Sequence, residues 1–252
     1  MSNGKNVMTN QITATYIDHM GSDLSVVNAA RVSFGKRSDW EFGDDKDYSA
    51  YTFGQEDGQI WLKLSDRDTK LIKYLAKHKH ISPFGHAFAS FHVKAPVFVA
   101  RQLVKHKFLR WNEISRRYVD DEPEFYTPEV WRGRSKDKKQ GSSGVIEDVL
   151  TKIYTGEFYG EYHFMDYRSA AEEMYKGLML QGVCPEQARM VLPQSMMTEW
   201  YWSGSLDAFA SMCHLRCKPD TQYESRIVAE AIDDEMMKLF PVSWEALRAY
   251  EE

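Results

Sequence analysis

A strand that runs directly into a helix is the feature that most restricts the fold. Residues 88–95 alternate apolar and polar side chains, so Phe91, Val93 and Ala95 share one face of a strand. Pro96 follows, and proline is favoured at the first helical position because the N–H it lacks would be unpaired there anyway. A helix is therefore expected over residues 97–106. A strand and a helix joined in this way indicate the α/β (α+β) class, with a mixed sheet flanked by helices.

The remaining elements are expected from periodicity and from turn residues. We expect a strand at 14–17, an extended stretch at 108–119, and loops at 35–59 and 133–144. Helices are expected at 23–31, 66–78, 145–182, 185–191 and 205–215. A last long helix is expected to open at Thr221, which has capping-box spacing to Glu224, and to close at Pro241.

The chain shows no internal repeat and no linker that would divide it. A polar segment at residues 1–13 is expected to be flexible, followed by a single domain over residues 14–252. A chain of 252 residues buries roughly 70–75% of the surface that its unfolded form exposes. It therefore needs no disulfide or structural metal to hold a core.

Charge and cysteine content limit the classes of function. Lys and Arg number 32 against 37 Asp and Glu, a net charge of −5, which argues against a dedicated nucleic-acid or membrane-surface protein. Three cysteines in a chain of this length indicate a reducing compartment. The N-terminus lacks the apolar core of a signal peptide, and no apolar run approaches the roughly 20 residues of a membrane span. We expect a soluble, cytoplasmic protein.

The charge is unevenly distributed. Residues 101–117 hold six basic side chains and one acidic one, a local net charge of +5 in an acidic protein. Such a segment suits an anionic ligand, most simply a phosphate. Two other interpretations stay open at this point: a solvated basic surface, which charge alone favours, and a nucleic-acid-binding module, which the overall negative charge opposes.

Spacing within this segment favours a small ligand. On the expected helix, Gln102 lies one turn from Lys105 and His106, so the three point the same way. In the extended stretch that follows, every second residue from 113 to 117 shares one face, which places an acceptor, a hydroxyl and a guanidinium together. These groups match a phosphorylated, hydroxylated molecule such as a nucleotide.

The same residues carry a motif. Residues 101–107 read Arg-Gln-Leu-Val-Lys-His-Lys, and residues 112–118 read Asn-Glu-Ile-Ser-Arg-Arg-Tyr. This resembles the signature of flavin-dependent thymidylate synthases, Arg-His-Arg, seven residues, then Ser, embedded in Arg-Gln … Asn-Glu-x-Ser-x-Arg-Tyr. The resemblance covers most of residues 15–245 in order, through further segments at 18–24, 30–34, 80–86, 91–98, 188–193 and 214–216.

The resemblance implies an enzyme that makes dTMP from dUMP. Methylenetetrahydrofolate would give the carbon, and FAD recharged by NADPH would give the hydride. The family fold is α/β, and its members are homotetramers with active sites between subunits. Residues 14–252 would then form the catalytic domain, with small-molecule partners, no nucleic acid and no membrane.

The site residues follow from the same resemblance. Arg216 would stabilise negative charge developing on the pyrimidine, and His80 would lie beside the flavin; these two are the expected catalytic residues. The expected dUMP-binding residues are Gln102, Leu103, Val104, Lys105, Glu113, Ile114, Ser115, Arg116, Arg117, Arg189 and Arg216. The expected FAD-binding residues are Ser82, Lys105, His106, Lys107, Glu113, Ser205, Asp207 and Ser211.

Five positions depart from the family pattern: Lys105, Lys107, Ser205, Asp207 and Ser211. Lys105 and Lys107 replace arginines, which keeps the charge and loses the planar fork, and Asp207 reverses a charge where FAD is expected. The alternative function is therefore a nucleotide- or flavin-binding protein that has lost catalysis.

No metal site is expected, because Cys213, His214 and Cys217 lack a fourth ligand nearby and fit a half-buried helix face better. Ser115 has no evident base to activate it as a nucleophile, so it is expected to hydrogen-bond the nucleotide.

Overall fold

The computed structural model describes residues 12–43, 51–53, 60–119, 121–135, 141–146, 150–155 and 158–249. The segment predicted to be flexible, residues 1–13, lies mostly outside these ranges, and its last residue, Thr13, already belongs to the first strand. No helix among the described residues is both long and apolar enough to cross a membrane.

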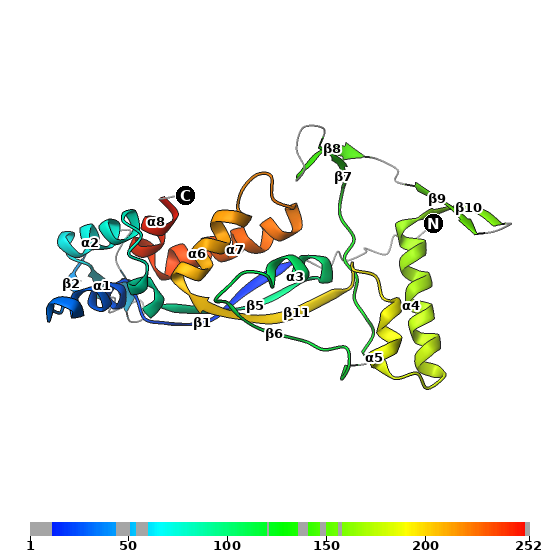
Figure 1. Ribbon diagram of the computed structural model, residues 1–252, viewed down its shortest axis with the longest axis horizontal. Coiled ribbons are helices and arrows are strands. Elements are labelled where there is room, and N and C mark those ends of the chain that lie inside the picture. Colours follow the sequence, from blue (N-terminus) through cyan, green and yellow to red (C-terminus); the bar gives the residue numbers. More distant parts are fainter. Residues whose placement is uncertain are drawn as a thin grey trace.

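A four-stranded sheet forms the centre of the molecule (Figure 1). Its strands lie in the order β1 (Thr13–Met20), β5 (Phe88–Pro96), β11 (Met197–Ser205) and β6 (Arg110–Glu113). The predicted α/β class and the strand over 88–95 are confirmed. The sheet is not mixed, because every pair of neighbouring strands described is antiparallel. Strand direction depends on partners far away in the sequence, which a local pattern does not specify.

Helices cover one face of this sheet (Figure 1): α3 (Val97–Leu103), α6 (Leu206–Arg216) and α7 (Tyr223–Leu239). The core beneath them is aromatic. Phe209 packs edge-on against Phe91 and Trp202, with ring centroids 5.4 and 5.7 Å apart. All three side chains are buried. Because Phe91 belongs to the apolar face predicted for residues 88–95, that face is the one that packs into the core.

Shorter elements pack at the end of the sheet where strand β1 ends, at Met20 (Figure 1). They are α1 (Asp23–Arg31), η1 (Val32–Phe34), β2 (Glu41–Phe42), β3 (Tyr51–Phe53), β4 (Ile60–Lys63), α2 (Asp66–Lys77), η2 (Ser82–His86) and α8 (Pro241–Ala249). The helices predicted at 23–31 and 66–78 are confirmed. The carboxylate of Asp23 accepts the backbone N–H groups of Val242 and Ser243 at 3.0 and 2.8 Å. It thereby caps α8, so Pro241 opens a new helix as well as following α7.

The opposite end holds two hairpins and a long helix (Figure 1): β7 (Trp131–Arg134), β8 (Ser142–Ile146), β9 (Leu150–Thr155), β10 (Phe158–His163), α4 (Phe164–Leu180), α5 (Pro185–Ala188) and η3 (Arg189–Val191). The helix predicted over 145–182 is wrong for the described residues before Phe164, which form strands. Apolar residues at helical spacing also fit short strands, and the valine, isoleucine, threonine and tyrosine content here favours strands. The loop predicted at 133–144 contains the end of β7 and the start of β8, which pair with each other, while its residues 136–140 lie outside the described residues.

Other boundaries also differ from the predictions. The predicted loop at 35–59 contains β2 and β3, while its residues 44–50 and 54–59 lie outside the described residues. The helix after Pro96 ends at Leu103, and the extended stretch becomes a turn at residues 116–118. The last long helix starts at Tyr223 with Gln222 as N-cap, because Thr221 instead donates its hydroxyl to the carbonyl of Leu215.

Candidate active site

Three cavities receive most of the residues expected to bind nucleotide or flavin. Cavity A, of about 850 Å³, lies between α3, α7 and the β7–β8 hairpin. Cavity B, of about 380 Å³, lies beside β6 and η3. Cavity C, of about 660 Å³, lies along α6. Pro193 and Gln194 line both A and B, and Lys105 lines both A and C, so cavity A adjoins each of the other two.

Cavity A brings together Gln102, Lys105 and Arg216. The side-chain oxygen of Gln102 accepts a hydrogen bond from the hydroxyl of Ser225, which is fully buried in α7. The amide nitrogen of Gln102 therefore remains available to donate to a ligand. The cavity offers this amide and the cations of Lys105 and Arg216 to a molecule that carries carbonyl oxygens and negative charge.

Arg216 also contacts His106. Its Nε donates a hydrogen bond to Nε2 of His106 over 2.9 Å. Burial, and then the charge of Arg216, lower the pKa of His106 to about 4. Burial also lowers the pKa of Arg216, which still remains charged because a guanidinium starts so high. At neutral pH the pair therefore joins a cation to an uncharged imidazole.

A half-buried polar cluster forms another wall of cavity A, and sequence reasoning missed it. Oε1 of Glu224 accepts from the Tyr126 hydroxyl at 3.3 Å and pairs with Nη1 of Arg132 at 3.2 Å. The Arg132 guanidinium also lies 3.8 Å from the ring centroid of Tyr223. Burial and the nearby Glu224 carboxylate raise the pKa of Tyr126, so its hydroxyl stays a donor. The only available signal was Glu224 itself, which was interpreted as a helix cap.

Cavity C is lined by five of the residues that were expected to contact the flavin. They are Lys105, His106, Lys107, Asp207 and Ser211. Four lysines and a single carboxylate, that of Asp207, are charged among its described lining residues. Phe108 and Lys79 both line this cavity with positive φ angles, 65° and 55°. Left-handed backbone at residues other than glycine costs free energy and concentrates at functional sites.

The donors and acceptors of cavity C fit FAD. The lysine cations match a diphosphate. The Asp207 carboxylate, which looked unfavourable for FAD in the sequence, has a buried Oδ1 with no hydrogen-bond partner among the described residues. Such an oxygen requires a donor. A ribityl hydroxyl or a ring N–H of a flavin would supply one.

Cavity B holds Glu113, Ile114, Arg116 and Arg189. Both carboxylate oxygens of Glu113 accept hydrogen bonds, Oε1 from Thr198 at 2.7 Å and Oε2 from the Trp111 indole at 3.0 Å. Neither donor was expected from the sequence. Alternation along β11 could have indicated Thr198, because it shares its face of the sheet with Trp200 and Trp202.

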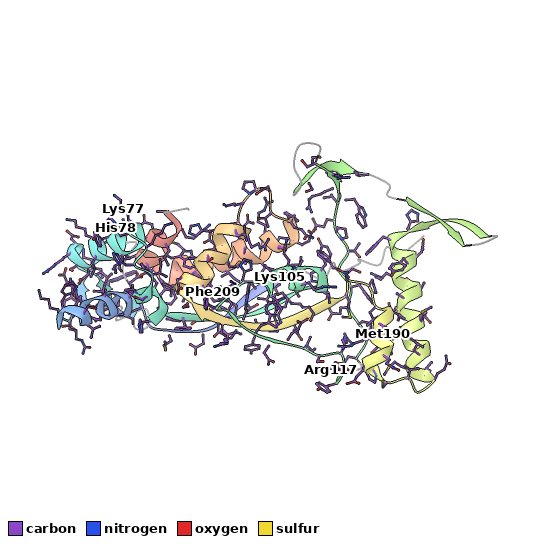
Figure 2. The ribbon with its side chains drawn as sticks, viewed as in Figure 1. Lys77, His78, Lys105, Arg117, Met190 and Phe209 are labelled. Atoms are coloured by element: carbon purple, nitrogen blue, oxygen red, sulfur yellow. The ribbon has the colours of Figure 1, made fainter. Side chains whose placement is uncertain are left out.

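The basic segment does not form one compact patch. Figure 2 shows Lys105 near the middle of the molecule and Arg117 at its lower edge. Ser115 accepts a 3.1 Å hydrogen bond from Nε of Arg117, so this hydroxyl and this guanidinium lie together although the predicted extended stretch ends in a turn. The charges of residues 101–117 are thus divided among the cavities and the exposed surface.

The remaining expected site residues lie away from the cavity linings. Leu103 is fully buried in the core, so only its backbone could meet a ligand, and Val104 is exposed. His80 and Ser82 are exposed; His80 stacks on Tyr74 at 6.1 Å, while its neighbours Lys79 and Ile81 line cavity C. Ser205 is buried as the residue before α6.

The cysteine-containing helix face has a structural role. Cys213 is buried with its thiol toward the carbonyl of Ala229, and His214 contacts the carbonyl of Leu247 and the guanidinium of Arg248. No group of three or more His, Cys, Asp or Glu residues in the described part of the chain could hold a metal ion. The interpretation of residues 213–217 as a packed helix face is consistent with these contacts.

Comparison with known proteins decides the family. The model of the family described as thymidylate synthase complementing protein matches residues 15–242. The chain belongs to this family. Among its relatives in the family, the flavin-dependent thymidylate synthase of Thermus thermophilus is 35% identical over 238 residues, which are 93% of this chain and 74% of the relative. The flavin-dependent thymidylate synthase of Kosmotoga olearia is 36% identical over 230 residues, 91% of this chain and 87% of the relative.

Solved structures of similar fold agree with this family assignment. The UMP/dUMP methylase PolB of Streptomyces cacaoi, bound with 5-Br dUMP, has a TM-score of 0.71 and 29% sequence identity, covering 96% of this chain and 97% of that one. The same protein bound with 5-Br UMP has a TM-score of 0.68 at 28% identity, covering 95% of this chain and 94% of that one. The fold and the family are therefore those of nucleotide methylases.

Proposed function

We propose that this protein converts dUMP to dTMP, with methylenetetrahydrofolate as carbon donor and FAD, recharged by NADPH, as reductant. The observation that carries the proposal is the meeting of Gln102, Lys105 and Arg216 in cavity A, next to cavity C with its lysines. Family membership and the uridine nucleotides bound by a protein of the same fold support this choice of substrate.

Arg216 would act on the pyrimidine. Negative charge develops on O4 and N3 of uracil when C5 reacts, and a half-buried guanidinium stabilises such charge far better than water does. Gln102, with its oxygen occupied by Ser225, would donate to a uracil carbonyl. Lys105 supplies a second cation at the boundary between cavities A and C.

Lys105, Lys107 and the Asp207 carboxylate would hold FAD in cavity C. When bound, FAD supplies the hydride that completes the methyl group. The protein's own contribution is to orient the reactants in cavity A, whose described lining combines aromatic side chains such as Phe98 and Trp131 with the polar groups of Gln102 and Arg216. We also propose a cytoplasmic location, because Cys184, Cys213 and Cys217 are free thiols that suit a reducing compartment.

We further propose a homotetramer with sites between subunits. On one chain the expected dUMP residues divide, with Gln102, Lys105 and Arg216 in cavity A and a second set, Glu113, Ile114, Arg116 and Arg189, in cavity B. A partner that presents its cavity B residues to cavity A would complete the set. Mixing Arg216→Ala subunits with Arg189→Ala subunits tests this, because only sites between subunits regain activity in mixed assemblies.

The decisive experiment is an anaerobic assay of dTMP formation from dUMP, methylenetetrahydrofolate, FAD and NADPH. Formation of dTMP that depends on all four supports the proposal. FAD and dUMP binding without dTMP would support the alternative, a protein of this fold that has lost catalysis through changes such as Lys105, Lys107 and Asp207. Salt-sensitive DNA binding without flavin binding would contradict both.

A second substrate deserves the same assay, because PolB is described as a UMP/dUMP methylase. Replacing dUMP by UMP tests whether the site tolerates a 2′-hydroxyl. A UMP turnover comparable to that of dUMP would broaden the substrate class to uridine monophosphates. A large preference for dUMP would restrict it to thymidylate synthesis.

A further inference from the structure

We infer that His106 is a positioning residue that holds the guanidinium of Arg216 toward cavity A. The inference rests on the proposed function, because it assigns His106 a role through the residue expected to act on the pyrimidine. The resemblance to the family suggested only a flavin contact for this histidine. The contact with Arg216 points to a second task for the same ring.

The geometry fixes both partners. The 2.9 Å hydrogen bond joins the last residue of α6 to the turn that follows α3, so it connects two separate elements. The His106 ring also lies against the indole of Trp202, with centroids 6.5 Å apart and planes at 60°. Trp202 is buried in the sheet core, so it offers the ring a rigid support.

The hydrogen bond directs the guanidinium. Nε is the guanidinium nitrogen nearest the chain, and a bond at this atom fixes the plane of the group while leaving both terminal nitrogens free to point elsewhere. Arg216 lines cavity A, whereas His106 lines cavity C. The pair therefore forms part of the boundary between the two cavities, with the donor fork of Arg216 on the side expected for the nucleotide.

The charges around His106 keep it able to accept this bond. Lys105, Lys107 and Lys218 line cavity C with it, and Arg216 contacts it directly; Asp207 is the opposing carboxylate in the described lining. Burial, and then the charge of Arg216, favour the neutral ring and lower the pKa of His106 to about 4. Because Nε2 accepts, the ring proton must reside on Nδ1.

Two substitutions separate positioning from simple packing. His106→Gln keeps an acceptor on a side chain that can reach Arg216, while His106→Leu keeps bulk without an acceptor. The dissociation constant of dUMP is measured by calorimetry on the FAD-free protein, and kcat and KM are measured at saturating FAD. We expect His106→Leu to weaken dUMP binding or lower kcat by about tenfold or more, and His106→Gln to recover most of the loss. Equal impairment of both variants, or a fully active His106→Leu, overturns the inference.

Nitrogen-15 NMR of the imidazole gives a test that does not depend on catalysis. With His106→Gln used to assign the signal among eight histidines, wild-type His106 should be neutral at pH 7, with its proton on Nδ1. Arg216→Ala should shift the Nε2 signal by removing its donor. A proton on Nε2, or an imidazolium at pH 7, overturns the inference. A protein that gives the expected spectrum but forms no dTMP would contradict the proposed function and leave the positioning contact intact.

Discussion

Thr198 donates a 2.7 Å hydrogen bond from Oγ1 to Oε1 of Glu113, linking β11 to the edge strand β6. The Trp111 indole holds the other carboxylate oxygen at 3.0 Å. Trp111 in turn stacks on the buried Trp200, with ring centroids 4.3 Å apart. The carboxylate that lines cavity B is thus oriented by two donors that are themselves fixed by the sheet and its core.

Thr198→Val should release one oxygen of Glu113 while nearly preserving side-chain shape. We expect the free energy of unfolding to fall by about 1–2 kcal/mol, since a charged acceptor loses a buried donor. Nucleotide affinity should weaken as well, because the Glu113 carboxylate keeps only its Trp111 donor and is less firmly oriented. Urea denaturation and dUMP calorimetry measure the two effects. Thr198→Ser, which retains the hydroxyl, should restore nucleotide binding; failure to do so would mean that the methyl group of Thr198 matters instead.

Arg216→Ala should abolish turnover while leaving FAD binding largely intact. Removing one preorganised donor from a site of this kind costs about 100-fold or more in kcat. FAD content is measured from flavin absorbance and turnover from dTMP formation. Unchanged turnover would contradict the role assigned to this guanidinium, and loss of flavin would place Arg216 in the cofactor site.

Asp68 should make stability depend on pH. Its side chain is only 4% exposed. Burial raises the pKa of this carboxyl, but hydrogen bonds from Arg31, Ser65 and Ser38 and the charge of Arg31 outweigh burial and hold the pKa below its usual value. A lowered pKa in the folded state gives stability that is complete above the unfolded pKa, about 4, and is lost as the pH falls through the folded value.

Asp68→Asn should therefore lower the free energy of unfolding at pH 7 by about 3 kcal/mol, because Arg31 loses a buried partner. The gap between variant and wild type should narrow below about pH 4. Urea denaturation at pH 7, 5, 4 and 3 measures it. Asp66→Asn is the control, since Asp66 is exposed in the same first turn of α2. A gap that stays constant across this pH range would show that the charge of Asp68 is unimportant.

Local signals were enough for some parts of the fold. Strand β5 was predictable because its buried side chains alternate, and α3 because Pro96 sets its start. The antiparallel order of β1, β5, β11 and β6 was not, since it depends on which distant strands meet. The hairpin β9–β10 was mistaken for helix because short apolar runs fit both periods.

The same division applies to the site. Gln102 and Lys105 stand in a motif and Arg216 in a matching segment, so all three could be proposed before the structure was known. Arg132 and Tyr126, which join Glu224 in cavity A, come from segments without a motif, and only folding brings them to α7. Asp207 looked unfavourable because its charge was visible in the sequence and its missing donor was not.

That missing donor leads to a test of the flavin site. If FAD supplies a hydroxyl or N–H to Oδ1 of Asp207, then Asp207→Leu, which has similar size and no acceptor, should weaken FAD binding by about tenfold. Asp207→Asn keeps an acceptor and removes a negative charge near the expected diphosphate, so it should bind FAD at least as tightly as wild type. FAD titration followed by flavin fluorescence measures both.

The two variants control for each other, because each removes the same carboxylate from the first turn of α6 and thus the same favourable interaction with the helix dipole. Their melting temperatures without FAD should fall together, while their FAD affinities should differ. If Asp207→Leu binds FAD as tightly as Asp207→Asn, the buried oxygen has no donor in the complex. Cavity C would then hold the flavin through its lysines alone, and the charge reversal at this position would be merely tolerated.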